Sequence, residues 1–199
     1  MKIKIVFFYL SVLGFCSCQP VSNEKSKIEI SSDQKTEWID LLEGDDLNQW
    51  EMYSEEALKG WEIVNGELHS SGAGWDANED IITKQSFSNF ELDLEWKISP
   101  GNSSGIFFYV QKGKDHPIYE EAPEYQVMDD KGWPEEMKPN QYTSASYAMY
   151  AAEGAEVKPV GEWNSTKIIV KYPLVQHWLN GLMTVEYEVG SADWKERKA

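Results

Sequence analysis

Residues 90–110 read FELDLEWKISPGNSSGIFFYV, and this stretch predicts the fold of the chain. Apolar and charged side chains alternate strictly from Glu91 to Ile98, which places the apolar ones on one face of a strand and the charged ones on the other. Residues 100–105 are Pro, Gly, Asn, Ser, Ser and Gly, a composition that predicts a tight turn. The apolar run Ile106–Val110 then predicts a strand buried on both faces. A charged sheet face beside an aromatic strand is suited to binding a sugar.

Further strand patterns follow on both sides of this stretch, separated by turns every ten residues or so. An Asn-Gly pair supplies the two positive-φ residues that a two-residue hairpin needs, and the chain has such pairs at Asn65-Gly66 and Asn180-Gly181. The expected strands are Trp38–Leu42, Trp61–Leu68 with its turn, Ile81–Ile82, Glu124–Asp129, Thr166–Tyr172, Leu174–Leu179 and Leu182–Glu188. The sequence therefore predicts an all-β sandwich or barrel.

The first residues predict export. Two lysines precede an apolar run at residues 5–15, which is too short to span a bilayer and is typical of a signal peptide over residues 1–17 rather than of a retained anchor. Cys18 follows the small residue Ser17, as in a bacterial lipoprotein processing site, whereas the alternative Cys16 follows bulky Phe15. We expect lipidation at Cys18, and an exported lipoprotein that is periplasmic or attached to the outer membrane through its lipid alone.

Composition limits the domain organisation and the binding partners that the rest of the chain can have. Residues 18–36 are rich in Ser, Lys, Glu and Asn and predict a flexible tether, and residues 37–199 are enough for one domain. The net charge is -16, or -18 without the two leader lysines, so nucleic acid is excluded as a partner by repulsion of its phosphates. The nine Trp and ten Tyr residues can fill a core and can also stack on sugars.

An ordered set of segments resembles the 3-keto-disaccharide hydrolase family, which is common in Bacteroidetes. The segments are Leu47–Trp50, Trp61–Leu68, Phe90–Trp96, Gly101–Ile106, Glu124–Asp130, Gly161–Asn164 and Trp178–Gly181. The resemblance implies a concanavalin-like jelly-roll of two antiparallel sheets with the active cleft on the concave sheet. It also implies action on glycosides whose C3 hydroxyl is oxidised to a ketone, in some members by elimination and then hydration.

The end of the chain departs from this pattern. Members of the family continue past the region of Asp193 into a final strand, whereas this chain ends at Ala199. We therefore expect either a fragment of a longer protein or a member that has lost its C-terminal strand, and a missing strand would leave a neighbouring strand with bare N–H and C=O groups. Asp193 and Glu196 predict a terminal helix of about one turn.

A 3-ketone acidifies the proton on C2, so cleavage needs a base and donors for the oxyanion. Glu124 and Gln126 lie on one face of an expected strand, about 6.6–7 Å apart. Glu124 is the leading carboxylate, as base or as a ligand of substrate or metal, and Gln126 is a candidate donor to a hydroxyl or the enolate. The alternative is an ordinary solvated sheet face.

Three further residues are candidate substrate contacts. Glu95 lies on the charged face of its strand, and its alternative role is an ion pair with a neighbour such as Lys97. Asn102 lies in the expected turn and has a purely local role as its alternative. Asp129 either lines the cleft or caps the loop that follows.

His177 is the second candidate catalytic residue because it lies on an expected core strand, although a lone His there is often a hydrogen-bonded packing residue. The three scattered His residues lack the spacing of a zinc site, whereas clustered carboxylates could hold Ca²⁺ or another divalent cation.

Two other functions stay open at this point. Residues 91–95, ELDLE, also resemble the alternating acid motif of sandwich-fold retaining β-glucanases, in which two carboxylates lie about 5–5.5 Å apart. The other alternative is a lectin-like, non-catalytic carbohydrate-binding module.

Overall fold

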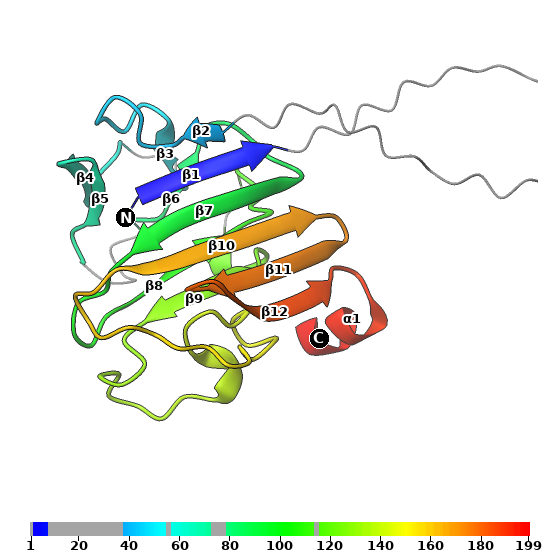
Figure 1. Ribbon diagram of the computed structural model, residues 1–199. Helices are drawn as coiled ribbons and strands as arrows, with labels where there is room; N and C mark the ends of the chain where they lie inside the picture. Colours follow the sequence, from blue (N-terminus) through cyan, green and yellow to red (C-terminus); the bar gives the residue numbers. More distant parts are fainter. Residues whose placement is uncertain (1, 8–37, 55–56, 73–78, 114–115) are drawn as a thin grey trace, which may run out of the picture.

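The chain folds as an antiparallel β-sandwich, in agreement with the expected fold class (Figure 1). The computed structural model describes residues 2–7, 38–54, 57–72, 79–113 and 116–199. Cys16, Cys18 and the expected tether at residues 18–36 lie outside the described residues.

The larger sheet has six strands, and each pairs with its neighbours in antiparallel fashion. In sheet order they are β12 (Leu182–Glu188), β11 (Leu174–Leu179), β10 (Asn164–Lys171), β7 (Phe90–Trp96), β1 (Lys2–Phe7) and β2 (Trp38–Asp40). The Asn-Gly turn between β11 and β12 forms as expected, because Asn180 and Gly181 both have positive φ angles (49° and 86°).

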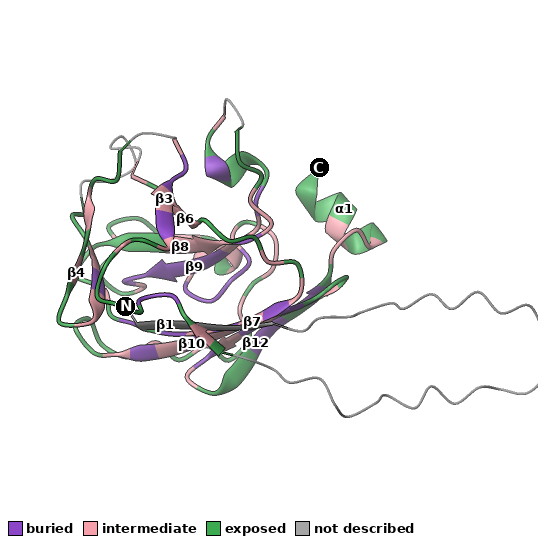
Figure 2. Ribbon diagram, turned by 90° about the horizontal axis from the view of Figure 1, so that it is seen from above, coloured by how far each residue is buried: buried purple, intermediate pink, exposed green. Residues whose placement is uncertain are grey.

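The rest of the sandwich is built from three two-stranded ribbons rather than one continuous sheet. The ribbons are β8 (Ser103–Phe107) with β9 (Glu124–Met128), β3 (Trp50–Met52) with β6 (Ile81–Thr83), and β4 (Trp61–Val64) with β5 (Glu67–Ser70). The helices among the described residues are η2 (Ile118–Glu120), η3 (Pro139–Gln141) and α1 (Ala192–Lys198). Seen from above, the largely buried strand β9 lies with β8 across the core from the strands of the larger sheet (Figure 2).

The sequence predicts a turn over residues 100–105, and the prediction is wrong for the second half of this range, which forms a strand. Ser103, Ser104 and Gly105 belong to β8, and the strand ends at Phe107 instead of Val110. Pairing with β9, from Ser103 opposite Met128 to Phe107 opposite Glu124, sets this register. The partner strand therefore overrides the turn preference of Ser and Gly, because propensity is a weaker determinant than pairing and burial.

The alternation of apolar and charged residues in β7 determines which of its side chains lie in the core. Phe90, Leu92, Leu94 and Trp96 are all buried, as the sequence predicts. A buried hydrogen-bond chain joins the layers: Trp96 Nε1 donates to Thr166 Oγ1 (2.9 Å), which donates to the Tyr125 hydroxyl (2.8 Å). Tyr125 of β9 is thereby fixed against β10 of the larger sheet.

Strand β1 comes from the expected signal peptide. It lies between β7 and β2, with its six residues in register with β7 and three of them with β2. Export with cleavage before Cys18 would remove β1 and leave this edge of β7 without a pairing partner. In the part of the chain that the structure describes, no helix is long and apolar enough to cross a bilayer.

Candidate active site

Strand β9 presents Glu124 and Gln126 on the face that turns away from the larger sheet. Tyr125 and Val127 point into the core between the layers, and alternation along the strand puts Glu124, Gln126 and Met128 on the opposite face. The sequence predicts this shared face correctly.

Both edges of β9 are occupied. One edge pairs with β8, and the other runs beside residues 143–150, here called the bracing segment. Tyr147 N donates to Glu124 O (3.0 Å), Ser144 N donates to Gln126 O (2.8 Å), and Gln126 N donates to Ala145 O (3.1 Å). The backbone that carries Glu124 and Gln126 is therefore held from two sides.

The face itself is not the ordinary solvated sheet face that the sequence left open as the alternative. Gln126 is only 6% exposed, Met128 is fully buried, and Glu124 is partly buried. The backbone of β8 approaches closely, and a Cβ on Gly105 would collide with the Glu124 carboxylate. A side chain at residue 105 would therefore displace the Glu124 carboxylate, and burial has removed much of the hydration of that carboxylate.

Burial, together with the smaller effect of the negative charge of Asp80, raises the pKa of the Glu124 carboxyl to about 8. In the amide orientation that satisfies its neighbours, Gln126 Nε2 donates to Glu124 Oε1 (3.1 Å) and to Ser104 O (3.2 Å). Gln126 therefore orients the carboxylate, and both of its N–H donors are already engaged. The arrangement can accept or deliver a proton near neutral pH.

The structure does not bring Glu95 together with Glu124 and Gln126. It is exposed on the outer face of the larger sheet, opposite to the buried side chains of β7. Glu91 and Asp93 share that face, and both form ion pairs with Lys167 of β10. The acidic residues of 91–95 thus lie on an outer face where Glu91 and Asp93 are ion-paired, which argues against the β-glucanase interpretation.

Asn102 and Asp129 lie together at the other end of the β8–β9 ribbon. Asn102 is exposed, its side chain donates to Pro100 O (3.2 Å), and its carbonyl accepts from Asp129 N (3.0 Å). The Asp129 carboxylate accepts from Gly101 N and Gly132 N, both at 2.9 Å, and these bonds lower its pKa. The structure therefore gives both residues local roles: Asn102 in the turn and Asp129 as the cap of the following loop.

His177 lies in the core between the layers, with its side chain closed off from solvent. Its ring is fully buried and contacts the rings of Tyr125, Phe108 and Tyr187, at centroid distances of 4.9, 6.0 and 6.0 Å. Nδ1 donates to Ser144 O (2.9 Å), whereas Nε2 is buried without a hydrogen-bond partner. Burial lowers the pKa of His177 to about 4. The ring is neutral and packs the core, which is the alternative that the sequence left open.

The depressed pKa of His177 predicts a loss of stability in acid. The unfolded chain binds a proton near pH 6.5 and the folded chain only near pH 4, so stability is present above pH 6.5 and declines as the pH falls toward 4. His177→Asn retains a donor for Ser144 O but does not titrate. We expect the variant to be less stable at pH 7, by roughly 1–3 kcal/mol for the cavity, but to lose less stability between pH 7 and pH 4. Denaturant unfolding at both pH values measures this.

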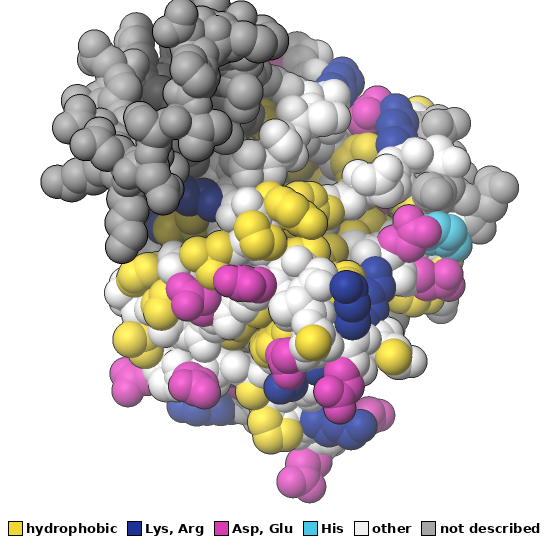
Figure 3. Space-filling model, turned by 90° about the vertical axis from the view of Figure 1, so that its right-hand side faces the viewer, with side chains coloured by type: hydrophobic (Ala, Val, Ile, Leu, Met, Phe, Trp, Pro, Cys, Tyr) yellow, Lys and Arg dark blue, Asp and Glu magenta, His cyan; other side chains and the backbone are white. Residues whose placement is uncertain are grey.

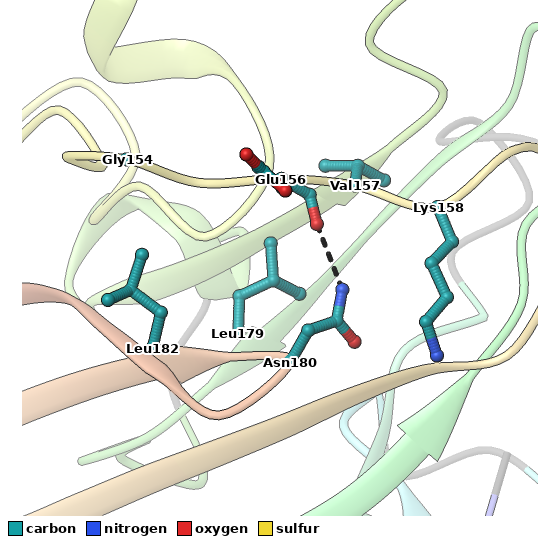
Figure 4. Close-up of a pocket in the computed structure, with 7 residues that line it drawn as sticks. All are labelled: Gly154, Glu156, Val157, Lys158, Leu179, Asn180 and Leu182. Carbon is teal, nitrogen blue, oxygen red and sulfur yellow. Dashed lines mark hydrogen bonds between the residues drawn. The ribbon is translucent and has the colours of Figure 1, made fainter.

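Two observations concern ligand binding elsewhere. Within the described ranges, no three His, Cys, Asp or Glu side chains gather as a metal site. A pocket of about 470 Å³ opens at the β11–β12 turn, lined by Gly154, Glu156, Val157, Lys158, Leu179, Asn180 and Leu182 (Figure 4). The Asn180 amide is held there by Glu156 O and Asn164 Oδ1, both at 2.9 Å, and neither Glu124 nor His177 lines the pocket.

The charged side chains on the face shown in Figure 3 do not indicate a second candidate binding site. Asp and Glu side chains there are spread among Lys and Arg side chains and do not form one acidic patch.

Sequence reasoning missed two parts of the site. Asp80 lies directly before β6, far from Glu124 in the sequence, and contributes to the raised pKa of Glu124. The bracing segment carries no strand pattern, and its pairing with β9 depends on tertiary structure. Its one local signal is the long polar loop that precedes it, which is unusual for a compact domain.

Comparison with known proteins gives the family. The family model described as the 3-keto-alpha-glucoside-1,2-lyase-like domain matches residues 37–199. The chain belongs to this family. A 3-keto-disaccharide hydrolase of Bacteroides thetaiotaomicron is 36% identical over an alignment of 177 residues, and the match covers 80% of this chain and 61% of that protein. The chain thus spans about three fifths of the length of this curated relative.

Solved structures agree with the family's sandwich fold. One protein of Parabacteroides distasonis, described as a candidate glycosyl hydrolase, superimposes with a TM-score of 0.74 at 35% identity, covering 80% of this chain and 76% of that one. A second protein from the same organism, with the same description, gives a TM-score of 0.61 at 29% identity over 74% and 70% of the two chains.

Proposed function

We propose that this member of the 3-keto-alpha-glucoside-1,2-lyase-like family cleaves 3-keto-glycosides, with Glu124 as the base that removes the proton on C2. The observation that carries the proposal is the Glu124 carboxyl: it is partly buried, its pKa is raised to about 8, and the Gln126 amide holds it. A catalytic base is most effective when its pKa lies near the working pH. The name of the Bacteroides relative supports the same substrate class.

The reaction proceeds as an elimination followed by a hydration. Glu124 accepts the C2 proton, and the electrons of that C–H bond form an enolate with the C3 ketone. The enolate expels the C1 oxygen substituent, which leaves with its electrons and takes up a proton. Water then adds across the C1=C2 bond, its oxygen to C1 and a proton to C2, and releases the 3-keto sugar.

The decisive experiment compares two matched substrates. We expect the protein to cleave a 3-keto-disaccharide and to leave the same disaccharide with an unoxidised C3 hydroxyl intact, because only the ketone acidifies C2. Equal cleavage of both would show ordinary glycoside hydrolysis. Binding of either without cleavage would favour the lectin-like module.

The raised pKa of Glu124 predicts the pH dependence of this activity. A base acts in its ionised form, so we expect kcat/KM to rise with pH and to level off above about pH 8. Asp80→Asn removes the charge that contributes to the raised pKa, so its curve should rise at lower pH. Glu95→Gln is the matched control, because Glu95 lies on the outer face of the other sheet. Activity that instead falls through pH 8 would make Glu124 an acid.

We also propose that the protein is an exported lipoprotein attached at Cys18, on the basis of residues 1–18. Cys18→Ala should release it from the membrane fraction, because a lipid chain and not a spanning helix would hold it. Fractionation followed by immunoblotting measures this, with Cys16→Ala as the matched control. Continued membrane association of Cys18→Ala would place the anchor elsewhere.

A further inference from the structure

Helix α1 is attached to the bracing segment through a side-chain clamp. The helix has seven residues, and its N-cap is Ser191, whose hydroxyl accepts from Trp194 N (3.1 Å); the sequence suggested a start at Asp193. A helix this short is marginal by itself. Its position therefore depends on the contacts that it makes with the rest of the chain.

The clamp consists of Tyr150, Asp193 and Arg197. The Asp193 carboxylate accepts from the Tyr150 hydroxyl (2.7 Å) and, through both oxygens, from Arg197 Nε (3.0 Å). Arg197 Nη1 also donates to Met149 O (2.9 Å), and the guanidinium lies 4.6 Å from the centre of the Tyr150 ring. Arg197 thus contacts the bracing segment at both a backbone oxygen and an aromatic face.

The bracing segment transmits this contact to the candidate site. Ser146 and Tyr150 exchange two backbone hydrogen bonds (3.0 and 2.9 Å), which closes a tight turn between the clamp and β9. Tyr147 N, inside that turn, donates to Glu124 O. Ala148 has a φ of 59°, a left-handed conformation that costs free energy for a residue other than glycine and persists only where the surroundings hold it.

We propose that Arg197 is a positioning residue for the site: with Asp193 and Tyr150 it holds the bracing segment on β9 and so keeps Glu124 in place for proton abstraction. This inference rests on the proposed function. The clamp is exposed, and exposed ion pairs contribute little to global stability. Catalysis is far more sensitive, because a displacement of about 1 Å can cost about 10²-fold in rate.

The test compares Arg197→Ala and Arg197→Lys with Lys195→Ala, which removes an exposed cation from the same helix without touching the clamp. We expect Arg197→Ala to lower kcat roughly tenfold with KM nearly unchanged, and Arg197→Lys, which keeps the charge but not the planar fork, to recover part of the loss. Lys195→Ala should behave as wild type. A kcat for Arg197→Ala equal to that of Lys195→Ala would overturn the inference.

Amide hydrogen exchange separates this inference from the proposed function. In Arg197→Ala, exchange should increase at residues 143–150 and 124–128 and stay unchanged in β10 and β11, a result that requires no substrate. If wild type fails to cleave any 3-keto-glycoside, the proposed function falls while the exchange data still decide whether the clamp holds the segment. Unchanged exchange at residues 143–150 would show that Arg197 does not hold it.

Discussion

Glu124→Gln is expected to lose 3-keto-glycoside cleavage by roughly 10²–10⁴-fold, the contribution typical of a positioned general base. An amide has the shape of the carboxyl but cannot accept the C2 proton. Steady-state kinetics at pH 8.5, where wild-type Glu124 is mostly ionised, measure the effect. Glu95→Gln, the same chemical change on the outer face of the larger sheet, should retain full activity.

The same substitution is expected to stabilise the fold at alkaline pH. The pKa of Glu124 is higher in the folded chain than in the unfolded one, so its contribution to stability is fully present below about pH 4.5 and is lost as the pH rises to about 8. Each pKa unit corresponds to about 1.4 kcal/mol. Glu124→Gln avoids this loss and should exceed wild type by roughly 3–5 kcal/mol at pH 9 and by much less at pH 5. If Glu124→Gln kept a kcat near that of wild type, or gained no stability at pH 9, Glu124 would not be the base proposed here.

Interruption of β1 is expected to cost several kcal/mol of stability in the full-length chain. Ile5→Pro removes a backbone N–H from a strand that pairs on both sides, with β7 and with β2, and proline is poorly tolerated in such central strands. We expect the melting temperature to fall by roughly 5–15 °C. Thermal unfolding of full-length protein purified without export measures this.

The matched control for β1 is Ser31→Pro in the expected tether, which should melt as wild type does. Equal melting temperatures for Ile5→Pro and Ser31→Pro would show that β1 contributes nothing to the sheet. A chain that begins at Cys18, as after leader cleavage, should be destabilised in the same way as Ile5→Pro unless another segment takes the place of β1 beside β7.

Local patterns predicted much of the sandwich. The alternation in β7 puts Leu92, Leu94 and Trp96 in the core as expected, because a period of two is a property of the strand itself. The turn at Asn65-Gly66 forms because both residues adopt the positive φ angles (54° and 73°) that a hairpin requires. The start of β8 at Ser103 was not predictable in this way, because pairing with β9 sets it.

The site was only partly predictable for the same reason. Alternation placed Glu124 and Gln126 on one face, but their burial results from segments distant in sequence, above all β8 and the bracing segment. Glu95 shows the converse: its pattern is equally regular, yet its face is the outer one. A period of two identifies two faces, and only the packing of the layers decides which face lies in a site.

The most direct test of the account is a comparison of a 3-keto-disaccharide with the same compound deuterated at C2. Removal of the C2 proton by Glu124 predicts a normal primary isotope effect on kcat/KM, together with solvent-derived hydrogen at C2 of the product. An isotope effect of unity with the original deuterium fully retained in the product would contradict the account, because the glycosidic bond would then break without cleavage of the C2–H bond.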